Sequence, residues 1–339
     1  MTRAAIVTGV AGQDGSYLTE LLLEKGYIVY GVSRYTSEPR QERLIHITSP
    51  NFKHVKCDMS DSSRITNIVQ DVSSEKSFDR IEVYNLAAQS HVKVSFDQPE
   101  WTANVNSLGA LRWLEAIRLT GDKRFRFYQA GTSEMFGKVL ETPQNEKTPF
   151  WPRSPYGVSK VYAYWITKNY RESYGMYACT GILFNHESPR RGEDFVTRKI
   201  TKAIGQNMFP IRLGNLDAKR DWGHAQDYVV AMWQMLQLDE PDDYVVSSGE
   251  THSVREFVEK AFECKGITIQ WSGQGDQEIG TNRDTGDTLV VVDPAFYRPA
   301  EVDILTGDSL KFRQISGWAP NYTFDDLVRT MVSSDFRDV

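Results

Sequence analysis

The sequence has little cysteine, no concentration of positive charge and no long apolar run. Its three cysteines, Cys57, Cys179 and Cys264, are odd in number and widely spaced, which argues against a disulfide framework or a zinc site. A formal net charge of -6 and the lack of any basic run give no reason to expect nucleic-acid or anionic-membrane binding. No apolar run reaches membrane-spanning length, and the first residues lead into a short apolar strand instead of a signal sequence. We therefore expect a cytoplasmic protein that binds neither nucleic acid nor membrane and holds no metal.

Short apolar runs alternate with helix-length amphipathic segments through the first half of the chain. We expect strands near residues 4–8, 28–32, 53–57, 81–86, 124–129 and 177–184, and helices over 15–25, 99–119 and 157–174. This alternation is typical of βαβ units. It predicts an α/β fold with a Rossmann-type, doubly wound parallel sheet.

The second half of the chain is less regular and predicts a smaller C-terminal substrate-binding lobe. We expect residues 1–184 to form the Rossmann domain and residues 185–339 to form mainly the substrate lobe. Two later segments, about 224–249 and 287–293, are regular enough to return to the Rossmann domain. The two lobes are therefore expected to interleave.

A glycine-rich turn joins the first predicted strand to the first predicted helix. Gly9, Gly12 and Gly15 have the spacing G-x-x-G-x-x-G. Such glycines permit a tight turn, close approach to a pyrophosphate and packing of helix on strand, while the helix N-terminus supplies N–H groups. Because a strand precedes the turn and a helix follows it, we predict a dinucleotide site that includes Gln13 and Asp14.

The second predicted strand ends in Ser33-Arg34, where NAD-binding proteins of this type carry an acid. An arginine can pair with the 2′-phosphate of NADP, so we favour NADP over NAD, the alternative being that Arg34 is an ordinary surface charge. Further cofactor contacts are expected after the third and fourth strands. These residues are Asp58, Met59, Leu86, Ala87, Ala88, Gln89 and Ser90.

The segment after the fifth predicted strand carries the candidate catalytic residues: two hydroxyl residues, a carboxylate, a tyrosine and a lysine. Thr132-Ser133-Glu134 comes directly after it, and Tyr156 precedes Lys160 by one helical turn. Tyrosine, with a pKa of about 10, is a poor base at neutral pH, and the lysine charge favours its phenolate. A hydroxyl residue together with this tyrosine and lysine forms a site suited to hydride transfer. Glu134 adds a base that redox chemistry alone does not need, which points to elimination of water.

These motifs resemble the extended short-chain dehydrogenase/reductase superfamily and, within it, the GDP-mannose 4,6-dehydratase family. The resemblance extends from Ala5 to about Asp326. It rests on residues 12–18, 85–92, 132–134, 152–156, 183–192 and 220–224. It implies conversion of GDP-mannose into GDP-4-keto-6-deoxymannose and water by internal hydride transfer through tightly bound NADP, a first step toward GDP-deoxyhexoses such as GDP-fucose or GDP-rhamnose.

The resemblance also implies roles for the catalytic residues. Tyr156 would take the proton from the hydroxyl on carbon 4, and Thr132 would hydrogen-bond that oxygen. Glu134 would remove the proton on carbon 5 and help water leave from carbon 6. Lys160 would hold the ribose and favour the Tyr156 phenolate. Ser133 would position Glu134 or the departing hydroxyl, or serve only as a structural cap.

The binding residues of the family fall on further positions of this chain. Trp101, His186 and Arg191 correspond to residues that contact the cofactor, although a buried structural histidine is an alternative for His186. The residues implied around the guanosine diphosphate are Asn185, Lys199, Arg220, Arg298 and Glu301. Arginine and lysine suit a diphosphate and a carboxylate suits guanine or ribose, the alternative for each being an exposed salt-bridge residue.

The chain departs from the family pattern at Tyr35, Thr36 and Trp101. Arg34-Tyr35-Thr36-Ser37 stands where many relatives have Arg-Arg-Ser-Ser, and Trp101 stands where a tyrosine is usual. In the family, the loop that holds the first of these segments reaches the cofactor site of a neighbouring subunit. We expect a homodimer or homotetramer, and Tyr35 puts the tetramer in doubt more than NADP binding.

Three other functions compete. Dehydratases of dTDP- or UDP-sugars are the nearest, but the dTDP-glucose enzymes tend to have Thr-Asp-Glu at the position of Thr132-Ser133-Glu134. Epimerases and reductases lack the glutamate. A non-catalytic NADP-binding protein would usually lose the tyrosine or the lysine, and both are present here.

Overall fold

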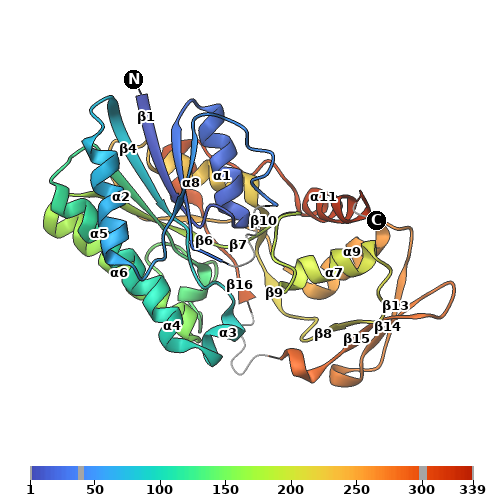
Figure 1. Cartoon of the computed structure of the whole chain (residues 1–339). Coiled ribbons are helices and arrows are strands. Elements are labelled where there is room, and N and C mark those ends of the chain that lie inside the picture. The colour runs from blue at the N-terminus through green and yellow to red at the C-terminus, as the bar shows by residue number, and fades with distance from the viewer. Residues whose placement is uncertain (1, 37–41, 298–303, 338–339) are drawn as a thin grey trace.

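A seven-stranded parallel sheet forms the centre of the larger lobe (Figure 1). The computed structural model describes residues 2–36, 42–297 and 304–337. The strands of this sheet are β1 (Thr2–Thr8), β2 (Ile28–Ser33), β3 (Phe52–Lys56), β4 (Phe78–Asn85), β5 (Phe125–Ala130), β6 (Tyr177–Leu183) and β11 (Tyr244–Val246). Their order is β11-β6-β5-β4-β1-β2-β3. The winding reverses between β1 and β4, which places a crevice at the carboxyl ends of these strands.

Helices cover both faces of the large sheet, so the predicted doubly wound fold is confirmed. On one face α1 (Gln13–Glu24) packs against α8 (Ala225–Met235). On the other lie α2 (Ser62–Ser74), α5 (Gly109–Thr120) and α6 (Pro155–Tyr174) (Figure 1). Both faces are apolar and buried, as a parallel sheet requires. No helix in the described ranges is both long and apolar enough to span a bilayer.

The smaller lobe has its own sheet and its own apolar core. Strands β8 (Ile211–Leu213), β13 (Ile269–Ser272), β14 (Ile279–Asn282) and β15 (Thr288–Val292) pair in the order β13-β14-β15-β8. Helices α7 (Val196–Gly205), α9 (Val254–Glu263) and α11 (Phe324–Arg337) supply much of the core beside this sheet (Figure 1).

Short strands and helices connect the two lobes. β7 (Asn185–Glu187) pairs with β10 (Trp222–His224), and β9 (Lys219–Arg220) lies between β12 (His252–Ser253) and β16 (Ile304–Leu305). Helices α3 (Val92–Asp97) and α4 (Pro99–Ala103) lie between β4 and α5 and pack against α6, and α10 (Leu310–Ser316) packs against β11 of the large sheet.

The chain returns to the large sheet after it has entered the smaller lobe. Helix α8 packs on α1, and β11 pairs with β6 at the sheet edge. The expectation that residues 287–293 also return was wrong, because β15 pairs with β8 and β14 in the small sheet. A run of apolar residues identifies a buried strand but does not say which sheet it joins.

Polar side chains of the large sheet hold the end of α8. Arg126 of β5 donates hydrogen bonds to the carbonyl oxygens of Leu236 at 2.7 Å and Leu238 at 2.8 Å. The hydroxyl of Tyr177 donates to the carbonyls of Met235 and Leu238. The last carbonyls of a helix lack partners within it, so these bonds satisfy groups that burial would otherwise leave unpaired.

The Arg126→Met substitution is expected to lower the free energy of unfolding by about 1.5 to 3 kcal/mol, the usual contribution of hydrogen bonds from a charged donor. Urea denaturation measures this change. Arg118→Met is the control, because Arg118 pairs with Glu115 on the surface, where both side chains are about a third exposed. It should lower the free energy of unfolding clearly less than Arg126→Met does, because the Arg118–Glu115 pair is solvated. Equal losses in the two variants would contradict the role of Arg126.

Candidate active site

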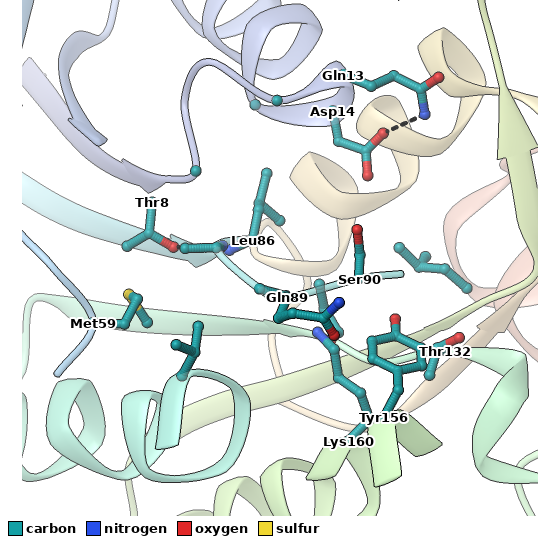
Figure 2. A pocket seen from close by; sticks show the side chains of 18 of the residues that line it. Thr8, Gln13, Asp14, Met59, Leu86, Gln89, Ser90, Thr132, Tyr156 and Lys160 are labelled. Atoms are coloured by element: carbon teal, nitrogen blue, oxygen red, sulfur yellow. Dashed lines mark hydrogen bonds between the residues drawn. The ribbon is translucent and has the colours of Figure 1, made fainter. Parts of the chain in front are cut away.

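A cavity of about 450 Å³ lies at the carboxyl ends of the large sheet (Figure 2). It occupies the crevice where doubly wound folds bind dinucleotides. The predicted site residues that line it are Gly9, Gly12, Gln13, Asp14, Gly15, Arg34, Asp58, Met59, Leu86, Ala87, Ala88, Gln89, Ser90, Trp101, Thr132, Ser133, Glu134, Tyr156, Lys160, Asn185, His186 and Arg191. The structure thus gathers residues from the glycine turn, the segments that follow β2 to β5, helices α4 and α6 and the region of β7 around one space.

The glycine turn depends on close backbone contacts. Gly9 has a φ of 69°, in the left-handed region, and its carbonyl accepts a hydrogen bond from the N–H of Gly12 at 2.8 Å. A Cβ on Gly15 would lie 2.3 Å from the carbonyl oxygen of Gly9. Helix α1 begins after Gly12, which has no side chain to cap it. Its first N–H groups are suited to a pyrophosphate, so the turn fits a dinucleotide.

Sequence reasoning predicted no role for Thr8, which lines the cavity, or for Asn106, which lies outside the lining but holds two of its segments. The Thr8 hydroxyl accepts from the backbone N–H groups of Leu86 and Ala87, both at 3.0 Å, and so fixes the loop after β4. Asn106 lies in a π-helical turn between α4 and α5, where one continuous helix was expected. The π-turn distinguishes Asn106 from other helical residues, but the sequence gives no sign of this turn and only the structure reveals it.

The amide of Asn106 connects the loop after β4 to the catalytic helix. It accepts from the Gln89 N–H at 2.8 Å and donates to the Gln89 carbonyl and the Ser159 hydroxyl, both at 3.0 Å. The Ser159 hydroxyl in turn donates to the carbonyl of Tyr156 at 2.7 Å. The buried Asn106 amide therefore fixes the loop after β4 relative to helix α6.

The far end of the cavity carries charge and one aromatic ring. The Arg34 guanidinium is exposed and lies 5.9 Å from the centre of the Trp101 ring. Asp58 accepts hydrogen bonds from the hydroxyl and the N–H of Ser60. The bond from the Ser60 hydroxyl holds the pKa of Asp58 below its usual value, and the charge of Arg34 acts in the same direction. This end fits an adenosine with a 2′-phosphate.

Helix α6 presents Tyr156 and Lys160 to the cavity. The Ser154 hydroxyl caps the helix by accepting from the Gly157 N–H at 3.0 Å, and Pro155 occupies its first turn. Figure 2 shows the Tyr156 ring beside the Thr132 side chain, with Lys160 nearby on the same helix. The Lys160 ammonium donates to the Ala130 carbonyl at 2.9 Å and lies 5.9 Å from the centre of the Tyr156 ring.

Burial opposes the charged forms of both residues. It raises the pKa of Tyr156 to about 12, although a hydrogen bond with Thr132 lowers it and the charge of Glu134 raises it further. Burial lowers the pKa of Lys160 to about 8. Ionised Tyr156 therefore needs positive charge from a bound ligand as well as from the protein.

Glu134 and Ser133 belong to a single 3₁₀ turn after β5, η2 (Ser133–Met135). The Thr132 hydroxyl caps this turn by accepting from the Glu134 N–H at 3.2 Å. Ser133 is buried and Glu134 is half-buried. A Cβ on Gly157 would lie 2.8 Å from the Glu134 carbonyl oxygen, so this glycine lets the turn approach the catalytic helix. The carboxylate is thereby placed on the same wall as Tyr156.

The predicted nucleotide-sugar residues are not all at the cavity. Asn185 lines it, whereas Lys199 and Arg220 lie in the smaller lobe outside its lining. The Lys199 ammonium donates to the Arg212 carbonyl at 2.6 Å and stacks on the Phe296 ring at 3.5 Å. Arg220 is buried and donates to the carbonyl of Lys219. Arg298 and Glu301 lie outside the described residues.

The sheet order, glycine turn and Tyr156–Lys160 pair define an extended short-chain dehydrogenase/reductase. A UDP-glucose 4-epimerase from Thermus thermophilus, solved with NAD, superimposes with a TM-score of 0.82 at 25% identity, covering 99% of this chain and 100% of that one. A dTDP-glucose 4,6-dehydratase from Bacillus anthracis, also solved with NAD, gives a TM-score of 0.80 at 21% identity, covering 98% and 96%.

Sequence similarity narrows this class. Residues 6–331 match the GDP-mannose 4,6 dehydratase family, and the chain belongs to that family. A GDP-mannose 4,6 dehydratase of Drosophila melanogaster is 53% identical over 347 residues, or 99% of this chain and 86% of the relative. The enzyme of Sinorhizobium fredii is 53% identical over 98% of this chain and 96% of its own length. The human enzyme is 51% identical over 98% and 91%.

Gly15→Ala is expected to weaken NADPH binding at least tenfold, because its new methyl group overlaps the Gly9 carbonyl and must displace the turn. Fluorescence titration of the cofactor-free protein measures the affinity. Gly121→Ala is the control. Gly121 has a φ of 66° and no atom within 4 Å of its Cβ position, so its substitution costs about 1 kcal/mol of stability and leaves binding unchanged. Unaltered affinity in Gly15→Ala would refute the role of the turn.

Proposed function

We propose that this protein converts GDP-mannose into GDP-4-keto-6-deoxymannose and water, with NADP returned to its starting state in every turnover. One observation supports the assignment above all others. The Glu134 carboxylate shares a cavity wall with Thr132, Tyr156 and Lys160, in a chain of the GDP-mannose 4,6 dehydratase family. Hydride transfer needs the hydroxyl, tyrosine and lysine, whereas removal of a carbon-bound proton needs a further base.

The cofactor site fits NADP. The glycine turn would hold its pyrophosphate and Arg34 its 2′-phosphate, with Asp58 and Met59 near the adenine and residues 86–90 along the dinucleotide. Lys160 would hold the ribose, and His186 and Arg191 would contact the cofactor from the opposite wall. When bound, NADP supplies a hydride acceptor that can later return the hydride, and a positive ring that favours ionised Tyr156.

The first half of the reaction is an oxidation at carbon 4 of the mannose. The Tyr156 phenolate removes the proton of the carbon 4 hydroxyl as hydride leaves that carbon, and the Thr132 hydroxyl hydrogen-bonds the oxygen. Lys160, whose ammonium is held by the Ala130 carbonyl, provides the charge that lowers the energy of the phenolate. The resulting ketone acidifies the hydrogen on carbon 5.

The second half eliminates water and reduces carbon 6. Glu134 removes the proton from carbon 5 and assists departure of the carbon 6 hydroxyl as water. Hydride then adds to carbon 6, and carbon 5 regains a proton. Ser133, buried beside Glu134, would hold this carboxylate or the departing hydroxyl. The product is a deoxy ketone, suited to later reduction to GDP-fucose or GDP-rhamnose.

We assign the guanosine diphosphate to the space between the lobes. Asn185 would contact it from the cavity wall, and Lys199 and Arg220 would contact it from the smaller lobe. Arg298 and Glu301, which lie outside the described residues, are assigned to it by the family resemblance alone. The stacked, hydrogen-bonded position of Lys199 requires its ammonium to move before it can pair with a phosphate. The enzyme is proposed to work in the cytoplasm.

We further propose that the protein is a homodimer formed through the outer face of α6. Val158, Tyr162 and Trp165 follow the helical spacing of one face and are 55%, 40% and 53% exposed. Leu108, in the π-turn packed on α6, is 41% exposed. Exposed apolar patches of this kind are typical of protein interfaces. A tetramer would need a second contact, and Tyr35, 81% exposed, lies in the loop that would have to provide it.

Glu134→Gln is expected to permit the oxidation but block the elimination. Since the Glu134 charge raises the pKa of Tyr156, its neutralisation does not impede the first proton transfer. Added GDP-mannose should therefore convert bound NADP into NADPH, seen by absorbance, without loss of water from the sugar by mass spectrometry. The wild type should remove one water and accumulate no NADPH.

Glu141→Gln is the matched control, because Glu141 accepts a hydrogen bond from Thr148 and does not line the cavity. It should behave as the wild type. Unchanged GDP-mannose in the wild-type reaction would overturn the proposed function. Normal product formation by Glu134→Gln would remove Glu134 from its role while leaving the activity itself in place.

Trp165→Glu is expected to convert the protein into monomers, because it places a charge in the proposed apolar interface. Light scattering measures the mass and also separates dimer from tetramer in the wild type. Met208→Glu serves for comparison, since Met208 is equally exposed at 53% but lies in the smaller lobe. A Trp165→Glu protein with the wild-type mass would exclude this face as the interface.

A further inference from the structure

A buried hydrogen-bond network joins the start of α1 to β7 across the cavity wall. The His186 Nε2 atom lies 2.9 Å from a carboxylate oxygen of Asp14, 172 positions away in sequence. The Gln13 side-chain amide donates to the other Asp14 oxygen and to the His186 carbonyl, both at 3.0 Å. The Gln13 amide oxygen accepts from the Ser188 hydroxyl at 2.8 Å. Four side chains therefore connect two segments that both line the cofactor cavity.

The partners of the His186 ring determine its charge. Its Nδ1 atom lies 2.7 Å from the Phe184 carbonyl, which can only accept a hydrogen bond. Its Nε2 atom faces Asp14, whose carboxylate also only accepts. An imidazole between two acceptors forms both bonds only when both nitrogens carry hydrogen. With Asp14 ionised, the geometry therefore fits an imidazolium that donates from both ring nitrogens.

The groups around His186 favour this charged state. Asp14 lies in the first turn of α1, where the positive end of the helix dipole stabilises a carboxylate. From α8, the Tyr228 ring stacks on His186 at 4.5 Å. From β10, His224 stays neutral, since burial and the charge of His186 lower its pKa to about 4. Arg191, in the turn after β7, opposes the imidazolium but forms an ion pair with Glu187 at 3.1 Å.

We propose that Asp14 and His186 form a carboxylate–imidazolium pair that positions the cavity wall opposite Tyr156 and fixes the charge there during the dehydratase reaction. This role rests on the proposed function. Figure 2 shows Asp14 with Gln13 on one side of the cavity and Tyr156 with Lys160 on the other. The charge of Asp14 raises the pKa values of both Tyr156 and Lys160, so a change in the pair reaches the catalytic residues.

The pair exists only within a pH window. Burial alone would lower the pKa of His186, but Asp14 outweighs it together with the Phe184 carbonyl, so the pKa lies above 6.5. The pKa of Asp14 lies below 3.8, because His186 and Gln13 overcome the effect of burial. The stabilisation by His186 is thus complete below pH 6.5 and lost as pH rises through its raised pKa. The stabilisation by ionised Asp14 is complete above pH 3.8 and is lost as pH falls through its lowered pKa.

Asp14→Asn tests the pair, because asparagine keeps the size and one acceptor but removes the charge. The measurement is an NMR titration of the NADP-bound protein labelled at histidine. The chain has six histidines, and His186→Gln identifies the signal. In the wild type, His186 should carry both protons at pH 7 and titrate above 6.5. In Asp14→Asn its midpoint should fall below 6.5, since burial then dominates.

The turnover number kcat should fall as His186 loses its charge. In Asp14→Asn, kcat should fall about tenfold for each pH unit above the lowered His186 midpoint. Asp243→Asn is the control, because Asp243 is buried and pairs with Arg171 through both oxygens, but lies outside the cavity lining. It should lose stability and keep the wild-type pH profile.

The outcomes separate this inference from the proposed function. A neutral His186 at pH 7 in the wild type would overturn the pair, whether or not the protein dehydrates GDP-mannose. A charged His186 with an unmoved kcat profile in Asp14→Asn would overturn its positioning role. Absence of dehydratase activity would refute the proposed function and leave the NMR test of the pair intact.

Discussion

The close contact between the glycine turn and the first residues of α1 is the constraint on which the site depends. Because Gly15 lies directly on the Gly9 backbone, the helix begins at the end of β1 with its N–H groups facing the crevice. The same turn brings Gly9 against Ala87 and so defines the opposite lip. The backbone of this turn therefore forms one wall of the cavity, and side chains from the other lining segments complete it.

Electrostatics inside the cavity follow from burial. Burial alone favours a neutral tyrosine and a neutral lysine, which would leave the site without an active base. For catalysis, neighbouring charges must offset the cost of ionising the buried Tyr156 and Lys160. On the wall that carries Tyr156, the main positive charge is that of Lys160. A positively charged ring of a bound cofactor would supply the missing charge, so we expect the Tyr156 base to act only when the cofactor is bound.

Much of this organisation can be predicted from local sequence. Apolar alternation predicted the sheet, and the glycine, tyrosine and lysine motifs predicted the residues that line the cavity, because each depends on short-range spacing. Features that depend on distant partners could not be predicted. The apolar run of β15 was assigned to the wrong sheet, and neither Thr8 nor the π-turn at Asn106 has a distinctive local pattern. The placement of Lys199 depends on the Arg212 carbonyl, which no motif specifies.

The late return of the chain has a consequence for biosynthesis. Strand β11 and helix α8 complete the large sheet, yet they are encoded after the first segments of the smaller lobe. During translation, one edge of the sheet and one of its faces stay uncovered until about residue 246 has left the ribosome. Over that interval the β6 edge and the apolar surface beside α1 are open to other chains. Because segments of the two lobes alternate along the chain, the period in which a nascent chain is prone to aggregate is prolonged.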